Sequence, residues 1–323
     1  MPKKKDTYKK DKYAARNLTL KYPHFLIVGM GRSGSLWTSA MLNAHRDIAS
    51  FPFLPFYTTS GEKRVGEVHF FNTLASLEPG TEGRFTRPIS GYLTMYGGVF
   101  ADLVPHEKKV SKEKFYAMLA KRYSEHCNSQ RGKKKIVGEL TSEYLFHLNF
   151  VDSFYPNIKK ICIIRDPKDK TVSWHFRTIA TGKKNEEKLT REFAIDYLNK
   201  RIIKEYEALL NYDGSVHCIT YEKLREDTPK YIKGAVQYLG MPVSDTIISR
   251  MIEEGSFESM TARDTKAKGR KRGEEDSTAQ IRKGVIGDWK NHLSADVAQE
   301  IDNATRDLRH RVFKKYNVDY ASL

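Results

Sequence analysis

The chain has 323 residues, with a hydrophobic fraction of 39% and a mean hydropathy of −0.60. This length suits one large α/β domain or two small ones, and no apolar run reaches the roughly 20 residues of a membrane helix. The net charge of +16 predicts anionic partners, and the three cysteines lack metal or redox spacing, which is typical of reduced thiols in the cytoplasm.

The first segment, residues 1–23, is strongly basic and lacks an apolar stretch. We predict a disordered arm here and a single domain over 24–323. No secretion signal is expected, because a basic start without an apolar segment behind it does not form one. We therefore expect a cytoplasmic protein.

The stretch Phe25–Ala40 combines an apolar run, a loop bounded by Gly29 and Gly34, and a helix-compatible segment. The pattern predicts a strand, a phosphate loop and a helix. A glycine turn at a helix N-terminus directs backbone N–H groups toward an anion, which the helix dipole also favours. We expect an oxyanion at this loop.

The loop differs from the G-x-x-x-x-G-K-[ST] pattern of nucleotide triphosphatases. Ser35 and Leu36 stand where that pattern has its lysine and its Mg²⁺-binding hydroxyl, and the cation lies inside the loop as Arg32. The sequence thus favours a group transfer without a metal.

A short strand is predicted at Ile48–Phe51, followed by an aromatic segment, 51–57, in which two prolines prevent a long run of regular structure. If Gly66–Asn72 is extended, Glu67, His69 and Phe71 share one face. A carboxylate and an imidazole there suit a base near a reacting hydroxyl, although a half-exposed strand with an ion-paired glutamate fits as well.

Residues 73–110 are rich in Gly, Pro and polar residues, which predicts a substrate-side loop region. A helix at Ser111–Cys127 and a strand at Ile136–Leu140 follow. This strand leads into a segment that contains Glu139 and Tyr144.

The next strong signal is Lys159–Ser173. An apolar strand ends at Arg165, Pro167 begins a helix, and Ser173 follows on that helix. Ligands bind beyond the carboxyl ends of parallel strands, where an arginine and a hydroxyl can hold a phosphate.

The rest of the chain also alternates between predicted helices and strands. We predict helices at 190–211, 229–239, 245–254 and 294–316, and a strand at 216–221 that ends at Tyr221. Between them, Arg282, Lys283 and Gly284 provide two cations and a glycine N–H, which can surround a terminal phosphate.

These segments resemble the sulfotransferases that use 3'-phosphoadenosine 5'-phosphosulfate (PAPS). The loop Arg32-Ser33-Gly34-Ser35-Leu36-Trp37 is similar to the family's [KR]-S-G-[ST]-T-W. Residues 165–173 are similar to its R-D-P-x-x-x-x-x-S, and residues 282–291 to R-K-G-x-x-G-D-W-K-N of the cytosolic enzymes. The segment 66–71 resembles K-E-x-H-F-F of the heparan-type enzymes, with Gly66 in place of the lysine.

The resemblance implies an α/β fold, a single P-loop-like domain whose central parallel sheet carries helices on both faces. It implies sulfuryl transfer from PAPS to a hydroxyl or amine, with adenosine 3',5'-bisphosphate (PAP) as product and no metal. Its implied catalytic residues are Glu67 as base, His69 as the second candidate base, and Arg32. The implied donor contacts are Arg32, Ser33, Gly34, Ser35, Leu36, Trp37, Arg165, Ser173, Tyr221, Phe257, Arg282, Lys283 and Gly284, of which Trp37, Tyr221 and Phe257 frame the adenine. Glu139 and Tyr144 match a segment on the acceptor side.

Two other functions stay open at this point. A P-loop kinase for a small molecule would require Mg²⁺, and a non-enzymatic binder of nucleic acid or another polyanion would use the basic arm. The acceptor of a sulfotransferase is either a small alcohol or phenol or a saccharide, and the positive charge favours an anionic one.

Overall fold

The computed structural model describes most of the chain. The described residues are 20–51, 54–57, 63–66, 69–75, 99, 100, 103, 109–182, 188–263 and 269–318. Most of the predicted basic arm lies outside them, as do Glu67 and most of the predicted loop region 73–110.

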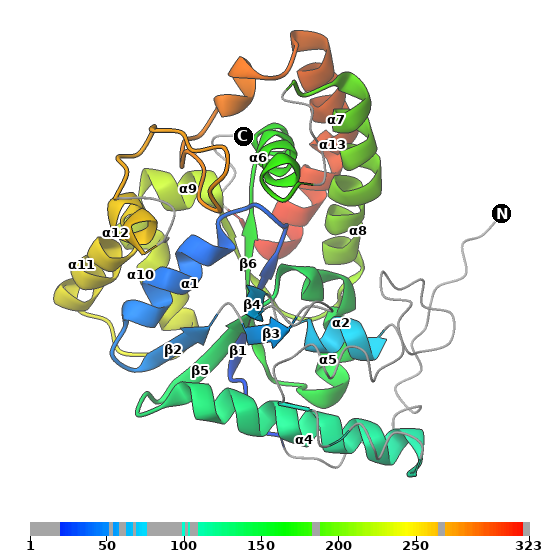
Figure 1. The fold of residues 1–323 in the computed structure, drawn as a ribbon, viewed down its shortest axis with the longest axis vertical. Helices are drawn as coiled ribbons and strands as arrows, with labels where there is room; N and C mark the ends of the chain where they lie inside the picture. Colours follow the sequence, from blue (N-terminus) through cyan, green and yellow to red (C-terminus); the bar gives the residue numbers. More distant parts are fainter. Residues whose placement is uncertain are drawn as a thin grey trace.

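A five-stranded parallel sheet forms the centre of the fold (Figure 1). The strands lie in the order β2-β5-β1-β6-β7. From β1 the chain first builds the β2 side and then crosses to the β6 side, so the strand order reverses beside β1, where sheets of this kind bind ligands. The bounds are β1 (Phe25–Gly29), β2 (Ile48–Phe51), β5 (Ile136–Leu140), β6 (Lys159–Ile164) and β7 (His217–Thr220).

The central strands are buried on both faces, as their continuous apolar runs predict. Phe25 and Ile27 of β1 enter one hydrophobic core, and Leu26 and Val28 enter the other. The strand β6 alternates in the same way. Two apolar cores therefore hold the sheet in place, one on each side.

Helices cover both faces, which confirms the predicted architecture (Figure 1). One core is shared with α1 (Ser35–Ala44), α9 (Tyr221–Glu226), α10 (Thr228–Tyr238) and α11 (Asp245–Glu254). The other core is shared with α4 (Lys112–Arg131), α5 (Leu148–Phe154), α6 (Pro167–Ala180), α7 (Arg191–Tyr197), α8 (Ile203–Asn211) and α13 (Ala295–Tyr316). The shorter elements are η3 (Ser142–His147), α12 (Phe257–Ala262) and η5 (Asp288–Asn291).

The predicted helix 190–211 contains a π-helical turn. This turn, η4 (Leu198–Ile202), lies between α7 and α8. Such turns are common at functional sites, and this one carries Arg201, whose contacts are described below.

Part of the aromatic segment is a short strand, and the segment after it differs from its predicted form. Strand β3 (Leu54–Tyr57) pairs antiparallel with β4 (Lys63–Gly66), so part of 51–57 is regular. Helix α2 (Phe70–Ala75) replaces the end of the predicted extended segment, so the prediction that His69 and Phe71 share a strand face is wrong. Phe70, Phe71 and Leu74 are all buried, and only a helix places these three positions on one face.

Candidate active site

The phosphate loop, residues 29–34, joins β1 to α1 at the carboxyl edge of the sheet. Gly34 precedes α1 with φ of 92°, and a Cβ there would lie 2.6 Å from Cδ2 of Tyr221. A side chain at Gly29 would lie 2.7 Å from the Ile163 carbonyl oxygen. Both glycines are required, because any other residue would be strained and would displace a neighbouring element.

The loop contacts the turn after β6. Nε of Arg32 donates to Oγ of Ser173 at 3.3 Å, and Nη1 of Arg165 donates to the Arg32 carbonyl at 3.3 Å. The structure thus brings together the two segments that the sequence marked as phosphate sites, although 133 positions separate Arg32 from Arg165.

Two buried polar atoms in this region have no hydrogen-bond partner among the described residues. They are Oγ of Ser33 and Nε of Arg165. Such groups are rare in folded proteins, because each costs free energy when it is left unpaired. A polar ligand between the loop and the β6 turn would satisfy them.

The remaining loop residues lie on α1. Oγ of Ser35 lies 3.5 Å from Oγ of Ser142, and Leu36 is half-buried. Trp37 donates its indole N–H to the Gly255 carbonyl at 2.7 Å, which ties the ring to the turn between α11 and α12.

The third segment, 282–291, is tied to the second by Asp169. This side chain is fully buried and accepts hydrogen bonds from the backbone N–H groups of Gly287, at 2.6 Å, and Trp289, at 3.0 Å. Sequence reasoning missed Asp169, which lies in the first turn of α6 with Oδ2 3.8 Å from Nη2 of Arg165. Nη2 of Arg165 also donates to the Val285 carbonyl at 3.1 Å.

Arg282 and Lys283 form ion pairs with carboxylates. Arg282 pairs with Asp288 and with Glu275, the latter at 2.5 Å, and Lys283 pairs with Asp288 at 2.7 Å. Burial of the Asp288 carboxyl opposes its ionisation, but hydrogen bonds from Lys283, Arg282 and Asn291 outweigh that effect and lower its pKa. The positive charge of this pair is therefore largely compensated within the chain.

Three aromatic rings lie beside the residues of these segments. The rings of Trp37 and Tyr221 meet edge to face at 5.8 Å, and the Arg165 guanidinium lies 4.5 Å from the Tyr221 ring centre. Phe257 lies against Gly284, because a Cβ on Gly284 would be 2.6 Å from that ring. All three rings predicted to frame an adenine thus belong to this region.

His69 lies beside a buried charge network. Its Nδ1 is 3.6 Å from Oε2 of Glu143 and 3.3 Å from the side-chain nitrogen of Asn72, which also lies 3.3 Å from Glu143. Arg201 holds the other oxygen of Glu143 at 3.0 Å and pairs with Glu205 at 2.8 Å. A Cβ on Gly31 would lie 3.9 Å from Nη2 of Arg201, so this network reaches the phosphate loop.

Glu139 and Tyr144 are both fully buried. Glu139 accepts hydrogen bonds from the hydroxyls of Tyr123 and Thr141. The Tyr144 hydroxyl accepts from the backbone N–H of Phe70 at 2.8 Å and so supports the start of α2. Their contact with an acceptor stays a prediction.

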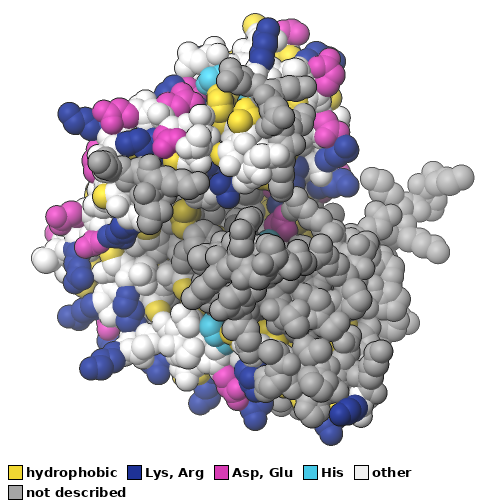
Figure 2. Space-filling model, in the orientation of Figure 1, with side chains coloured by type: hydrophobic (Ala, Val, Ile, Leu, Met, Phe, Trp, Pro, Cys, Tyr) yellow, Lys and Arg dark blue, Asp and Glu magenta, His cyan; other side chains and the backbone are white. Residues whose placement is uncertain are grey.

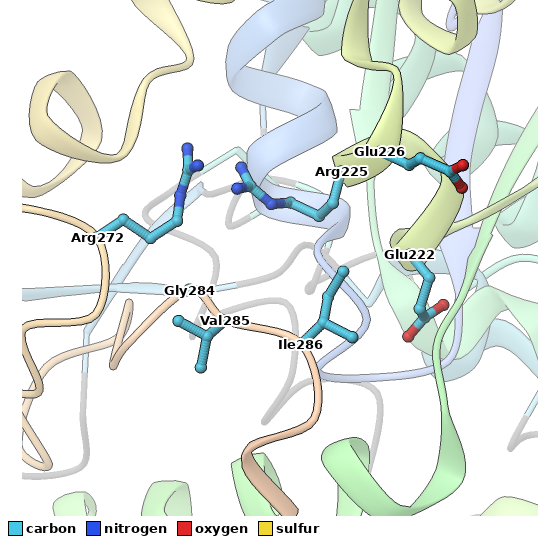
Figure 3. Close-up of a pocket in the computed structure, with 7 residues that line it drawn as sticks. All are labelled: Glu222, Arg225, Glu226, Arg272, Gly284, Val285 and Ile286. Atoms are coloured by element: carbon cyan, nitrogen blue, oxygen red, sulfur yellow. The ribbon is translucent and has the colours of Figure 1, made fainter. Parts of the chain in front are cut away.

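A cavity of about 470 Å³ adjoins Gly284 (Figure 3). Its lining comes from α9 and from the chain between α12 and η5. The residues are Glu222, Arg225, Glu226, Arg272, Gly284, Val285 and Ile286. Neither Arg225 nor Arg272 belongs to a spaced motif of the sequence.

Glu222 is the buried acid of this cavity. One carboxylate oxygen accepts from the Asp166 backbone N–H at 3.0 Å, and the other has no partner among the described residues. Burial raises the pKa of Glu222 to about 7, against the lowering effect of that hydrogen bond.

The last features concern surface charge, metal ligands and membrane-spanning helices. Figure 2 shows Lys and Arg side chains along the described margin of one face of the molecule, with Asp and Glu among them. The described residues contain no group of three His, Cys, Asp or Glu side chains arranged to hold a metal ion, and none of their helices is long and apolar enough to cross a membrane.

Comparison with known proteins identifies a family model over most of the chain and curated relatives over about half of it. The family model described as "Sulfotransferase domain" matches residues 22–316. The sulfotransferase 2B1 of Mus musculus is 23% identical over 180 residues, which cover 50% of this chain and 52% of that protein. The sulfotransferase 6B1 of Danio rerio is 26% identical over 172 residues, which cover 50% and 56%. The chain thus aligns with about half the length of these relatives.

Two solved structures share the fold over most of the chain. A sulfotransferase from Alicyclobacillus acidocaldarius superposes with a TM-score of 0.51 at 16% identity, covering 93% of this chain and 98% of that one. The mouse sulfotransferase SULT7A1, solved in complex with PAP, gives a TM-score of 0.50 at 19% identity, with coverages of 92% and 89%.

Proposed function

The chain belongs to the sulfotransferase domain family, and on that premise we propose that it transfers a sulfuryl group from PAPS to an acceptor hydroxyl or amine. The observation that carries this proposal is the meeting of three segments, 29–34, 165–173 and 282–291, at one edge of the sheet. The PAP complex of the mouse relative supports the donor. Relatives named cytosolic sulfotransferases support a cytoplasmic location.

The residues present fit an anionic nucleotide. The N-terminus of α1 and Arg32 favour negative charge, and the unpaired Oγ of Ser33 and Nε of Arg165 are suited to a polar ligand. Ser173, Arg282, Lys283 and Gly284 would take part in holding the phosphate on the ribose. Trp37, Tyr221 and Phe257 would frame the adenine, since aromatic faces stack on purines.

PAPS supplies an activated sulfuryl group whose leaving group is a phosphate. Glu67 would accept the acceptor's proton, and the freed electron pair would form the new bond to sulfur. The bond from sulfur to the bridging oxygen breaks in line, and its electron pair stays on the departing phosphate. Arg32 would stabilise the charge that develops there at little reorganisation cost.

A thermal-shift titration without metal tests the proposal. PAP at 100 times its Kd should stabilise the chain by about 2.7 kcal/mol, and Arg165→Ala should abolish the shift. Stabilisation by Mg-ATP alone would replace the proposal with the kinase alternative. No response to either ligand, together with salt-dependent binding of DNA that requires the basic arm, would favour the polyanion binder.

The role of Glu67 has its own test. Glu67→Gln should lower kcat by about 100-fold or more, the usual scale for loss of a general base, while PAP affinity stays nearly unchanged. Full activity in this variant would transfer the role to His69 or Glu139.

The proposal identifies the acceptor by its chemical class only. We propose an alcohol, a phenol or a saccharide, with anionic members favoured by the net charge of +16. A screen of matched neutral and anionic acceptors at low and high salt tests this preference. A greater salt effect on the anionic acceptors is expected, and equal rates for both classes would contradict it.

A further inference from the structure

Arg201, on the π-helical turn η4, is held in place by the charge network beside His69. Its Nε donates to Oε1 of Glu205 at 2.8 Å, and its Nη1 donates to Oε1 of Glu143 at 3.0 Å. Glu205 lies on α8 and Glu143 on η3, so carboxylates from two elements hold one guanidinium. Glu205 also pairs with Lys170, and both of these side chains are fully buried. The plane of the Arg201 guanidinium is therefore fixed.

The third nitrogen of this guanidinium, Nη2, is directed at the phosphate loop. It would lie 3.9 Å from a Cβ on Gly31, and it forms no hydrogen bond with any residue that the structure describes. The guanidinium carbon lies over the Phe146 ring, 4.8 Å from its centre, and the Arg201 side chain is 21% exposed. An N–H that is fixed in this way and has no partner among the described residues is suited to an anionic oxygen of a ligand.

Unusual backbone conformations occur at both ends of this chain of contacts. Arg32, which follows Gly31 in the loop, has φ of 69°, and His69 has φ of 50°. Residues other than glycine rarely adopt this left-handed region, and such strain is typically kept at functional sites. Within the described ranges Asn317, at the end of α13, is the one other case. The strain therefore favours a functional site at the two ends that Arg201 joins.

The contacts of Arg201 connect the loop with the side of the proposed base. Nη2 lies against Gly31, and the Glu143 that Nη1 holds has its Oε2 3.6 Å from Nδ1 of His69. Glu67, the proposed base, precedes His69 by two positions. In an in-line transfer the sulfuryl group passes from the phosphate at the loop to the acceptor oxygen at the base. It therefore crosses the space between the two sides that Arg201 connects.

We propose that Arg201 is a catalytic residue, whose Nη2 binds a non-bridging oxygen of the sulfuryl group of PAPS. This inference rests on the proposed function and adds a residue from outside the motif segments. The bonds that form and break are those given above, and Arg201 keeps its protons throughout. Arg32 acts on the bridging oxygen, whereas Arg201 acts on the group that moves. Because its ion pairs orient it before the donor binds, Arg201 stabilises the transferred group at little reorganisation cost.

The experiment compares two ligands that differ by the sulfuryl group. Affinities for PAPS and for PAP are measured by isothermal titration calorimetry without an acceptor, in the wild type and in Arg201→Met. We expect PAPS affinity to fall about 10- to 100-fold, the scale of a lost charge-assisted hydrogen bond, and PAP affinity to change less than about threefold. The kcat of the variant should fall about 100- to 1000-fold, as for the loss of one oxyanion donor.

A second variant covers the case in which Arg201→Met does not fold, since that change leaves Glu143 and Glu205 without their partner. Arg201→Lys keeps a positive charge beside both acids, but one nitrogen cannot reach two carboxylates and the loop together. It should keep the wild-type melting temperature and still lose about tenfold or more in PAPS affinity relative to PAP. The matched control is Arg191→Met, at a site on α7 that is 55% exposed and pairs with Glu300, and it should change neither affinity.

The ratio of the two affinities decides the outcome. Equal losses for PAPS and PAP would mean that Arg201 only maintains the shape of the loop, and would overturn the proposal. An unchanged ratio in the folded variants, even with a lower kcat, would overturn it as well, because the sulfuryl group would then have no contact with Arg201. Failure of the proposed function looks different, since the wild type itself would bind neither nucleotide.

Discussion

The side of the site that we propose binds the donor, called the donor side below, and the side near His69 are built in different ways. The donor side consists of three contiguous segments whose backbone groups are fixed by hydrogen bonds, such as those from Gly287 and Trp289 to Asp169. The side near His69 consists of single side chains from separate elements, held by the charges of Glu143 and Arg201. Under the proposed function, we therefore expect donor binding to depend on loop geometry, whereas the side near His69 depends on electrostatics.

The largest effect is expected from a substitution on the donor side. Asp169→Ala leaves two backbone N–H groups without their buried acceptor, which should destabilise the fold by about 3 kcal/mol and lower the melting temperature by roughly 6–12 °C. Thermal denaturation measures this. Asp307→Ala is the control, since Asp307 is 79% exposed on α13, and an equal loss in both variants would contradict the role of Asp169.

The second prediction separates the two sides. Under the proposed function, Glu143→Gln should lower kcat by about 10- to 100-fold, because His69 loses its anionic neighbour, while the Kd for PAP stays within about twofold. Steady-state kinetics and calorimetry measure the two quantities. Glu125→Gln, at a site 56% exposed, should change neither. A parallel loss of PAP affinity would show that the two sides are not independent.

The third prediction sharpens the geometric account of the donor side. Gly284→Ala introduces a Cβ 2.6 Å from the Phe257 ring, so the loop must move and PAP affinity should fall about tenfold. Gly287→Ala is a matched control, because its φ of 79° is close to the 70° of Gly284 but nothing lies within 4 Å. Equal losses in the two variants would mean that backbone strain alone, and not the contact with Phe257, is responsible.

The last prediction concerns the titration of Glu222. Its pKa is about 7 in the folded chain because of burial, against an ordinary value of 4.5. The folded chain therefore binds this proton more tightly than the unfolded chain, so the contribution to stability is full below pH 4.5 and is lost as pH rises through 7. Glu222→Gln removes that loss.

Urea unfolding at pH 5 and pH 8 tests this prediction. The stability of Glu222→Gln relative to the wild type should rise between these pH values by on the order of 1–3 kcal/mol. Glu226→Gln, at an exposed neighbouring site, should keep the wild-type pH dependence. If Glu222→Gln kept the wild-type pH dependence of stability, the titrating group would be a different one.

Much of the fold was predictable because its signals are local. The apolar runs of β1 and β6 mark strands buried on both faces, Pro167 marks the start of α6, and the glycines 29 and 34 mark a turn that only glycine tolerates. The start of α2 was not predictable in this way. Its six residues are too few for a clear period, and the burial of Phe70, Phe71 and Leu74 in the second core decides their conformation.

The sequence alone determined the fold class, the phosphate loop and the residues of three motif segments, because spacing along the chain expresses each of them. Only the tertiary structure decided which charges are compensated. The Asp169 carboxylate accepts the backbone N–H of Gly287, which is 118 positions away in the sequence, and Glu143 pairs with Arg201, 58 positions away. Arg225 faces Arg272, which belongs to a different element. Side chains so far apart in the chain become neighbours only when the sheet and its helices assemble, so local pattern carries no record of their pairing.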